Sequence, residues 1–178
     1  MIKGSLKRNN IPSLYVEILI SNDMMNVAKK RADGIPETIK NSILKGKGRI
    51  TGALGEIAFI KFSGGRESRN REVYNFDVVT DTGLYEIKTK LRSGCPKEYY
   101  ECSVANFNSS QECDYYVFAS TIHNYSKVWL LGYLSKEDFK KKRIFRKKGE
   151  YDPDNGQTCT ADCWNVKINQ LNNIREIL

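Results

Sequence analysis

Apolar residues recur at near-helical spacing in two segments of the chain, from about residue 12 to residue 32 and from about residue 52 to residue 62. Pro12 suits the first turn of a helix, because its missing N–H is not needed there. Between the two segments lies the glycine-rich, basic sequence LKGKGRITG. The pattern therefore predicts two helices, with a basic loop before the second.

Extended segments rich in valine and aromatic residues follow. The first two form a candidate hairpin over residues 73–92, VYNFDVVTDTGLYEIKTKLR. Three more strands are predicted in YYECSVANF, CDYYVFAS and KVWLLGYL, and a short one near WNVKI. Ser135 is a good N-cap for a helix over SKEDFKKK. This order predicts an α+β domain in which helices flank a mixed central sheet.

A chain of 178 residues fits one domain, with an expected core at about 50–135 and a basic C-terminal extension at about 136–178. No segment approaches the roughly 20 consecutive apolar residues that cross a bilayer. The opening MIKGSLKRNN lacks the apolar stretch of a secretory signal. Five cysteines without regular spacing suit reduced thiols. We therefore expect a cytoplasmic protein that does not contact a membrane.

The chain carries 29 Lys and Arg against 21 Asp and Glu, a net charge of +8. Such an excess favours a polyanionic partner such as DNA, because binding releases condensed counterions; a solvated basic face is the alternative. The densest positive stretch, KEDFKKKRIFRKKGEY, interleaves cations with aromatic residues. The candidate DNA contacts are Lys140, Lys141, Lys142 and Arg143 there, Lys45, Lys47 and Arg49 in the glycine-rich loop, and Lys90 and Arg92 on the predicted hairpin.

Three charged residues interrupt the predicted hairpin: Asp77, Glu86 and Lys88. Residues two apart on a strand share a face, so Glu86 and Lys88 point the same way. A two-residue turn at DT would place Asp77 opposite Glu86, and one at TG would place it opposite Lys88. A three-residue loop would instead oppose Asp77 to Ile87 and separate the charged groups unless a bulge restored the register.

Two carboxylates held this close repel each other, and a divalent cation removes the repulsion by taking both as oxygen ligands. A surface ion pair between Lys88 and Glu86 is the alternative interpretation. Glu56 adds a third carboxylate, within the second predicted helix and beside its apolar stripe. A glutamate in that position is unlike an ordinary solvated residue, although a helix-edge side chain that reaches water gives the same pattern.

Taken together, these residues resemble the PD-(D/E)XK nuclease superfamily, which includes many restriction endonucleases, Holliday-junction resolvases and some homing endonucleases. The resemblance covers roughly residues 51–120: a helix bearing Glu56, NFDVV with Asp77, YEIKTK with Glu86 and Lys88, and the later strand CDYYVFAS. The dipeptide NF stands where the family name has a proline before the aspartate. The resemblance implies a restriction-endonuclease-like fold.

The resemblance also implies a metal-dependent DNA endonuclease that hydrolyses phosphodiester bonds. Asp77 and Glu86, with the backbone carbonyl of Ile87, would hold Mg²⁺ or Mn²⁺, and Glu56 would complete the ligand shell or place a second ion. The metal would stabilise charge on the scissile phosphate and acidify its bound water. Lys88 would orient or help deprotonate that water.

Other active sites fit the sequence poorly. His123 is the only histidine, which argues against a His-rich zinc site or an HNH-type nuclease. The sequence GKGRITG lacks the spacing of a phosphate-binding GxxxxGK[ST] loop. Cys159 and Cys163 could contribute to a zinc site with other cysteines, but CxxC knuckles are missing. Gln111 lies where some relatives have a polar site residue, and an ordinary loop glutamine is the alternative.

Two broad functions remain open on the sequence. A nuclease could be a branched-DNA resolvase, a restriction or homing enzyme, or a repair enzyme. The alternative from another class is a non-catalytic DNA-binding or assembly protein that retains the fold. A homodimer would let one site per chain cut two strands.

Overall fold

The structure is a computed structural model that describes residues 15–33, 48–68, 76–106, 111–152 and 157–177. Six strands form the main sheet, in the spatial order β1 (Val16–Leu19), β7 (Lys127–Ser135), β6 (Tyr115–Ile122), β4 (Gly83–Arg92), β3 (Val78–Thr80) and β2 (Arg66–Glu67). Strands β4 and β6 are parallel, whereas the other neighbours in this sheet are antiparallel. The expected α+β fold with a mixed central sheet is thus confirmed.

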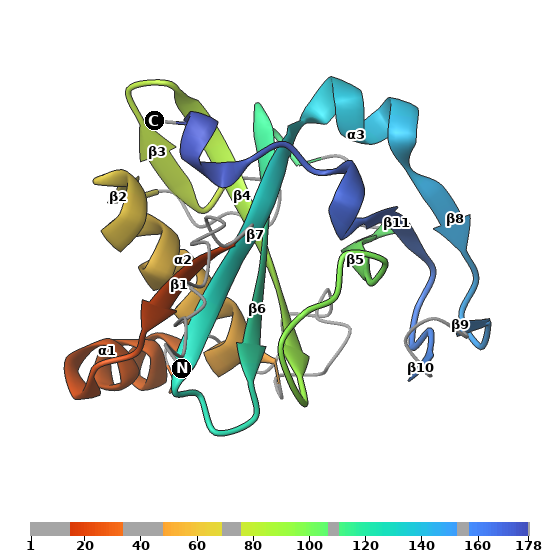
Figure 1. The fold of residues 1–178 in the computed structure, drawn as a ribbon. Coiled ribbons are helices and arrows are strands. Elements are labelled where there is room, and N and C mark those ends of the chain that lie inside the picture. Colours follow the sequence, from red (N-terminus) through yellow and green to blue (C-terminus); the bar gives the residue numbers. More distant parts are fainter. Residues whose placement is uncertain (1–14, 34–47, 69–75, 107–110, 153–156, 178) are drawn as a thin grey trace, which may run out of the picture.

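A second, antiparallel sheet has the order β5 (Glu101–Ala105), β11 (Cys163–Lys167) and β8 (Ile144–Arg146), and β9 (Tyr151–Asp152) pairs with β10 (Gln157–Thr158). The α-helices are α1 (Asn22–Asp33), α2 (Arg49–Ser63) and α3 (Lys136–Lys142), and the 3₁₀ helices are η2 (Ile168–Gln170) and η3 (Ile174–Ile177). Helices α1 and α2 lie on one side of the main sheet, and α3 with the second sheet lies on the other (Figure 1). None of the helices in these described ranges has the length and apolar character needed to span a bilayer.

Helix α2 packs on the main sheet through an apolar core. Leu54 and Phe59 are fully buried there against Tyr85 of β4. Gly55 permits this close approach, because a Cβ at that position would lie only 1.8 Å from the Thr89 hydroxyl oxygen. The contact fixes the turn of α2 that carries the next residue in the chain, a predicted site residue.

The opposite face of the main sheet is covered by a second apolar cluster. Tyr116 and Phe118 of β6 contact the buried ring of Phe139 from α3, with ring centroids 4.9 and 6.0 Å away. Val104 of β5 and Val166 of β11 join the same cluster. The main sheet is therefore a middle layer, and the second sheet is integral to the domain.

The sequence prediction was wrong for the first half of the helix expected at 12–32. Residues Val16–Leu19 form β1, which pairs with β7 in the register Val16↔Leu130 to Leu19↔Lys127. Exposure alternates along this strand, as it does when one face of a strand is covered. Only α1, from Asn22, is helical in this region. Pairing with a strand distant in sequence overrode the local spacing.

Other predicted elements are confirmed. Helix α2 covers the second helical segment, and strands β5, β6, β7 and β11 fall within or across the four later extended segments. Ser135 caps α3, because its hydroxyl accepts a hydrogen bond of 3.0 Å from the Asp138 N–H. Residues after 135 also complete the core: β11 lies between β5 and β8, and Ile174 of η3 is fully buried.

Candidate active site

The register of the β3–β4 hairpin brings two of the predicted carboxylates together. Val78 pairs with Tyr85 and Thr80 with Gly83, so the turn has two residues, Asp81 and Thr82. The two-residue turn at DT, one of the two expected on the sequence, is therefore confirmed. Asp77 lies directly before β3, and its N–H donates to the carbonyl of Tyr85, the residue that already pairs with Val78, so its carboxyl group lies beside β4 and close enough to Glu86 to feel its charge.

Asp77 is anchored to the neighbouring strand by its backbone and its side chain. Its N–H donates to the Tyr85 carbonyl at 2.9 Å, and its Oδ2 accepts from the Ile87 N–H at 2.7 Å. These bonds fix the carboxyl group at the edge of β4. Ile87 thus contributes its amide to Asp77, whereas its carbonyl was the group predicted to help hold a metal.

Glu86 is almost completely buried, with 4% of its surface exposed. Its Oε1 accepts hydrogen bonds from Lys88 Nζ at 2.6 Å and from Gln111 Nε2 at 2.5 Å. Its Oε2 is buried and has no hydrogen-bond partner among the described residues, and the same holds for Gln111 Oε1. A buried acceptor without a partner costs stability, so this half-satisfied carboxylate calls for an explanation.

The other three residues predicted to form the site all act on the Asp77 carboxyl group. Burial raises the pKa of Asp77 well above its ordinary value, and the nearby charges of Glu86 and Glu56 raise it further. Lys88 and the hydrogen bond from the Ile87 amide oppose this rise. The negative charges therefore crowd at this point, which favours uptake of a proton or of a cation.

Glu56 reaches the site from α2, but its carboxylate has another partner. Its Oε2 lies 3.3 Å from Nη1 of Arg31 on α1, and Nη2 of the same arginine lies 2.8 Å from Glu67 on β2. In the part of the chain that the structure describes, no three His, Cys, Asp or Glu side chains gather closely enough to hold a metal ion. Glu56 thus acts on Asp77 through its charge and is not gathered with the other two carboxylates as a third ligand.

Two further polar residues connect Glu86 to α3: Gln111 contacts Glu86, and Lys136 contacts Gln111. Gln111, which the sequence left open as a loop residue, is buried against it. Lys136, the first residue of α3, donates its ammonium group to the Gln111 carbonyl, and its amide donates to Asp114 at 2.8 Å. Sequence reasoning missed Lys136, because no local pattern links it to a loop 25 residues earlier.

A thiol also lies close to the carboxylates. Burial and the Glu86 charge raise the pKa of Cys113 to about 12. The group therefore stays a neutral thiol at ordinary pH, which excludes it as a thiolate nucleophile. All five cysteines are free, and none joins a cluster of metal ligands in the described ranges, so a zinc site built from them gains no support.

The predicted DNA contacts on β4 are tucked beneath the second sheet. Arg92 is 7% exposed, and its guanidinium donates to Ser120 Oγ at 2.9 Å and to the Glu101 carbonyl at 3.1 Å. Lys90 Nζ donates to the same carbonyl at 3.0 Å, and burial lowers its pKa. These two cations bond β5 to β4, so their donors are used within the fold.

The predicted contacts on α3 are exposed. Lys141 pairs with Glu137 at 2.7 Å on the helix surface, and Lys142 donates to the Gln170 carbonyl at 3.0 Å. Arg49 is half-buried at the start of α2. Lys45 and Lys47 lie outside the described residues.

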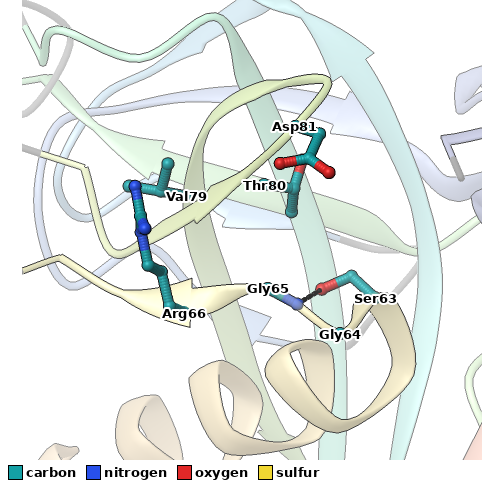
Figure 2. Close-up of a pocket in the computed structure, with 7 residues that line it drawn as sticks. All are labelled: Ser63, Gly64, Gly65, Arg66, Val79, Thr80 and Asp81. Atoms are coloured by element: carbon teal, nitrogen blue, oxygen red, sulfur yellow. Dashed lines mark hydrogen bonds between the residues drawn. The ribbon is translucent and has the colours of Figure 1, made fainter.

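A separate hollow of about 220 Å³ lies between the end of α2 and the β3–β4 turn. Arg66 and Asp81 contribute to its lining, and Ser63 Oγ accepts a hydrogen bond of 3.1 Å from the Gly65 amide (Figure 2). None of the predicted catalytic residues lines it. The carboxylate site on the β3–β4 hairpin is therefore distinct from this hollow.

Comparison with known proteins adds nothing to this geometry. The sequence matches no protein-family model, and no curated protein is significantly similar to it. The resemblance to PD-(D/E)XK nucleases therefore stays a prediction, which depends on the residues of the site alone.

Proposed function

We propose that this protein is a metal-dependent DNA endonuclease that hydrolyses phosphodiester bonds at the β3–β4 hairpin. The observation that carries the proposal is the proximity of Asp77 to Glu86, whose buried Oε2 has no hydrogen-bond partner among the described residues. Lys88 lies 2.6 Å from the other oxygen of Glu86. Two carboxylates beside one ammonium group are the arrangement that the resemblance implies for phosphodiester hydrolysis.

The donor atoms of this site fit a hard divalent cation. The carboxylates of Asp77 and Glu86, with the Ile87 carbonyl, offer only oxygen, which suits Mg²⁺ or Mn²⁺ better than softer metals. Mg²⁺ commonly uses one or two carboxylates and keeps several waters, so a third carboxylate is not required. A cation would also offset the crowding of negative charge that raises the pKa of Asp77.

The residues divide the chemistry among themselves. When bound, the metal would supply Lewis acidity to the scissile phosphate and lower the pKa of a bound water. Lys88, held by Glu86, would place a positive charge where negative charge develops in the transition state and would orient the attacking water. Gln111 fixes Glu86 through Oε1 and leaves Oε2 available. Glu56 would contribute its charge from α2.

One observation favours the alternative function, a non-catalytic DNA-binding protein with this fold. Arg31 neutralises Glu56 at 3.3 Å, and the described residues contain no cluster of three metal-ligating side chains. A site that has lost catalysis would tolerate this pairing. The two proposals therefore differ in whether DNA is cut or only bound.

A cleavage assay separates them. The protein is incubated with supercoiled plasmid, linear duplex, single strands and a four-way junction, each with Mg²⁺, Mn²⁺ or EDTA. We expect cleavage that EDTA abolishes and that D77N loses. The matched control is D81N, the same charge change at an exposed position of the same hairpin.

Tight binding of every substrate without cleavage would support the non-catalytic alternative. Cleavage by D77N, with contaminating nuclease ruled out, would overturn the assignment of the site. A homodimer is part of this proposal, because two copies with one site each can cut both strands; the mass of the DNA complex in solution tests it.

A further inference from the structure

Exposed apolar side chains concentrate in one basic segment of the chain. Among the described residues, three of the six exposed large apolar side chains lie within residues 144–151: Ile144, Phe145 and Tyr151. Residues 136–148, which overlap the start of this region, contain eight Lys and Arg against two Asp and Glu. Their net charge is +6, and that of the whole chain is +8. Exposed apolar side chains flanked by cations fit an anionic partner that also offers flat apolar faces.

One of these side chains, Phe145, belongs to a cluster with Arg143 and Trp164, which we call the stacked cluster after the contact of the Arg143 guanidinium with the Trp164 ring; the Phe145 and Trp164 rings are tilted by 60°. The Arg143 guanidinium carbon lies 4.0 Å from the centre of the Trp164 ring. Phe145 of β8 stands opposite Trp164 of β11, and their ring centroids are 4.9 Å apart. The buried ring of Phe139 lies 6.0 Å from Arg143 on the inner side. The stack thus leads from the core to Phe145, which is 39% exposed.

The Arg143 guanidinium is oriented but has unused donors. Contact with the Trp164 ring restricts its plane, and its N–H groups donate to no acceptor among the described residues. A guanidinium carries five N–H donors in a fixed fork that matches a phosphate. Lys140 and Lys147 nearby in sequence form no ion pair within the described ranges. The segment therefore offers a pre-oriented phosphate-binding group beside an exposed ring.

The stacked cluster is connected to the carboxylate site. Helix α3 begins at Lys136, which contacts Gln111, and Gln111 in turn holds Glu86. The helix has seven residues, about 10 Å at 1.5 Å per residue, and ends just before Arg143. Burial raises the pKa of the Tyr116 hydroxyl; the charge of Glu86 raises this pKa further and the charge of Arg143 opposes the rise, so both charges act on the same group. One short helix thus joins the stacked cluster to the residue that holds Gln111.

We infer that the stacked cluster binds an unpaired nucleotide of DNA close to the bond that is cut, with Arg143 on a phosphate and Phe145 against the base. In a duplex the faces of the bases are stacked on one another, and a ring can reach them only by unstacking a base step, whereas an unpaired base offers its face without that cost. The substrate class is then DNA with a single-stranded segment, such as a flap or a branch. This inference rests on the proposed nuclease function for the position of the cut, and on the stacked cluster alone for binding.

Binding in EDTA tests the inference without any cleavage. Fluorescence anisotropy measures the affinity of the full chain for a labelled 12-nucleotide single strand, an abasic strand of the same length and a blunt duplex. F145A removes the exposed ring, and I144A is the matched control, because Ile144 is the next residue on β8, points to the opposite face and is similarly exposed at 43%. R143K keeps the charge but loses the planar fork.

We expect the single strand to bind more tightly than the duplex. F145A should weaken binding of the base-containing strand about tenfold, within the range measured for one stacked base, and leave the abasic strand unchanged. I144A should stay within about twofold of the wild type on both strands. R143K should weaken both strands, since a phosphate is present in each.

Several results would overturn the inference: equal affinity of the wild type for normal and abasic strands, equal losses in F145A and I144A, or preference for the duplex. If F145A fails to fold by circular dichroism, F145L keeps the apolar volume without an aromatic face and should show the same base-dependent loss. Failure of the nuclease proposal would instead appear as binding of every substrate without cleavage in Mg²⁺ or Mn²⁺, a result that leaves these affinities in EDTA unaffected.

Discussion

Two buried glutamates on the same side of the main sheet differ in how completely their oxygens are used. Glu101 is 1% exposed, and both of its oxygens accept hydrogen bonds: Oε1 from Arg146 at 2.7 Å, and Oε2 from Asn165 at 2.6 Å. Glu86 is 4% exposed, and only Oε1 is used. Both side chains are buried acids with a basic partner, yet only one has all of its acceptors satisfied.

Under the proposed function, the difference separates a glutamate with a structural role from one that binds a cation. A buried carboxylate whose oxygens are all bonded stabilises its surroundings once formed, and the network around Glu101 ties β5 to β8 and β11. A buried carboxylate that keeps one oxygen without a partner carries a desolvation cost that its own fold does not offset. Glu86 therefore has the character of a binding group, although residue type and burial are nearly the same.

The largest expected effect is on cleavage at the half-satisfied site. D77N removes one carboxylate charge beside Glu86 and should lower the cleavage rate by about 10²–10³-fold, the range for loss of one group that stabilises a transition state. D81N, in the turn of the same hairpin, should keep the wild-type rate. The measurement is the initial rate of plasmid nicking with Mg²⁺. Equal rates in D77N and the wild type would place catalysis elsewhere.

The second effect is on folding, at Glu101, whose two oxygens are both bonded. E101Q should lower the free energy of unfolding by about 3 kcal/mol, the lower end of the range for breaking a buried ion pair. We expect the lower end because Arg146 still pairs with Glu150 at 2.6 Å and is partly exposed to solvent. E98Q, an exposed change three residues earlier, should have little effect. Urea denaturation measures both. A small loss in E101Q would show that completeness of bonding does not mark structural importance here.

The third prediction separates metal binding from catalysis. Lysine is not a metal ligand, so K88A should lose cleavage but keep the stabilisation that Mg²⁺ gives, about 2.7 kcal/mol at 100 times the dissociation constant. D77N should lose both. Thermal unfolding at increasing Mg²⁺ measures the stabilisation. If Mg²⁺ stabilises wild type, K88A and D77N equally, the ion binds at another place.

The fourth prediction concerns pH without metal. The pKa of Asp77 is higher in the folded protein than its ordinary value of 3.8, so the folded state holds more protons than the unfolded state between these two values. The contribution of Asp77 to stability is then fully present below pH 3.8 and is lost as pH rises through the folded pKa. The slope can reach about 1.4 kcal/mol per pH unit.

The comparison that isolates this group is the wild type against D77N in EDTA. The two should differ little near pH 4, and D77N should become relatively more stable as pH rises. Urea denaturation across this pH range measures the difference. A difference that stays constant with pH would show that Asp77 keeps an ordinary pKa, and that crowding of charge at the site is weaker than we infer.

Helices and strand faces that depend on short sequence patterns could be predicted from the sequence. Helix α2 follows from its apolar composition and spacing, and α3 from Ser135, whose hydroxyl satisfies an amide of the first turn. Period-two alternation placed Glu86 and Lys88 on one face, and a two-residue turn was enough to bring Asp77 near them. These features depend on residues within a few positions of each other, so the backbone preferences of a short segment specify them.

Contacts between side chains that are distant in sequence could be found only from the tertiary structure. Strand β1 forms because β7 supplies its hydrogen bonds. In the same way, Arg31 pairs with Glu56, and β5 covers Arg92. The missing partner of Glu86 Oε2 among the described residues belongs to the same level. Each of these features depends on groups that are far apart in sequence. The free energy of their contacts depends on burial and on competing partners, and a local sequence pattern predicts neither of these.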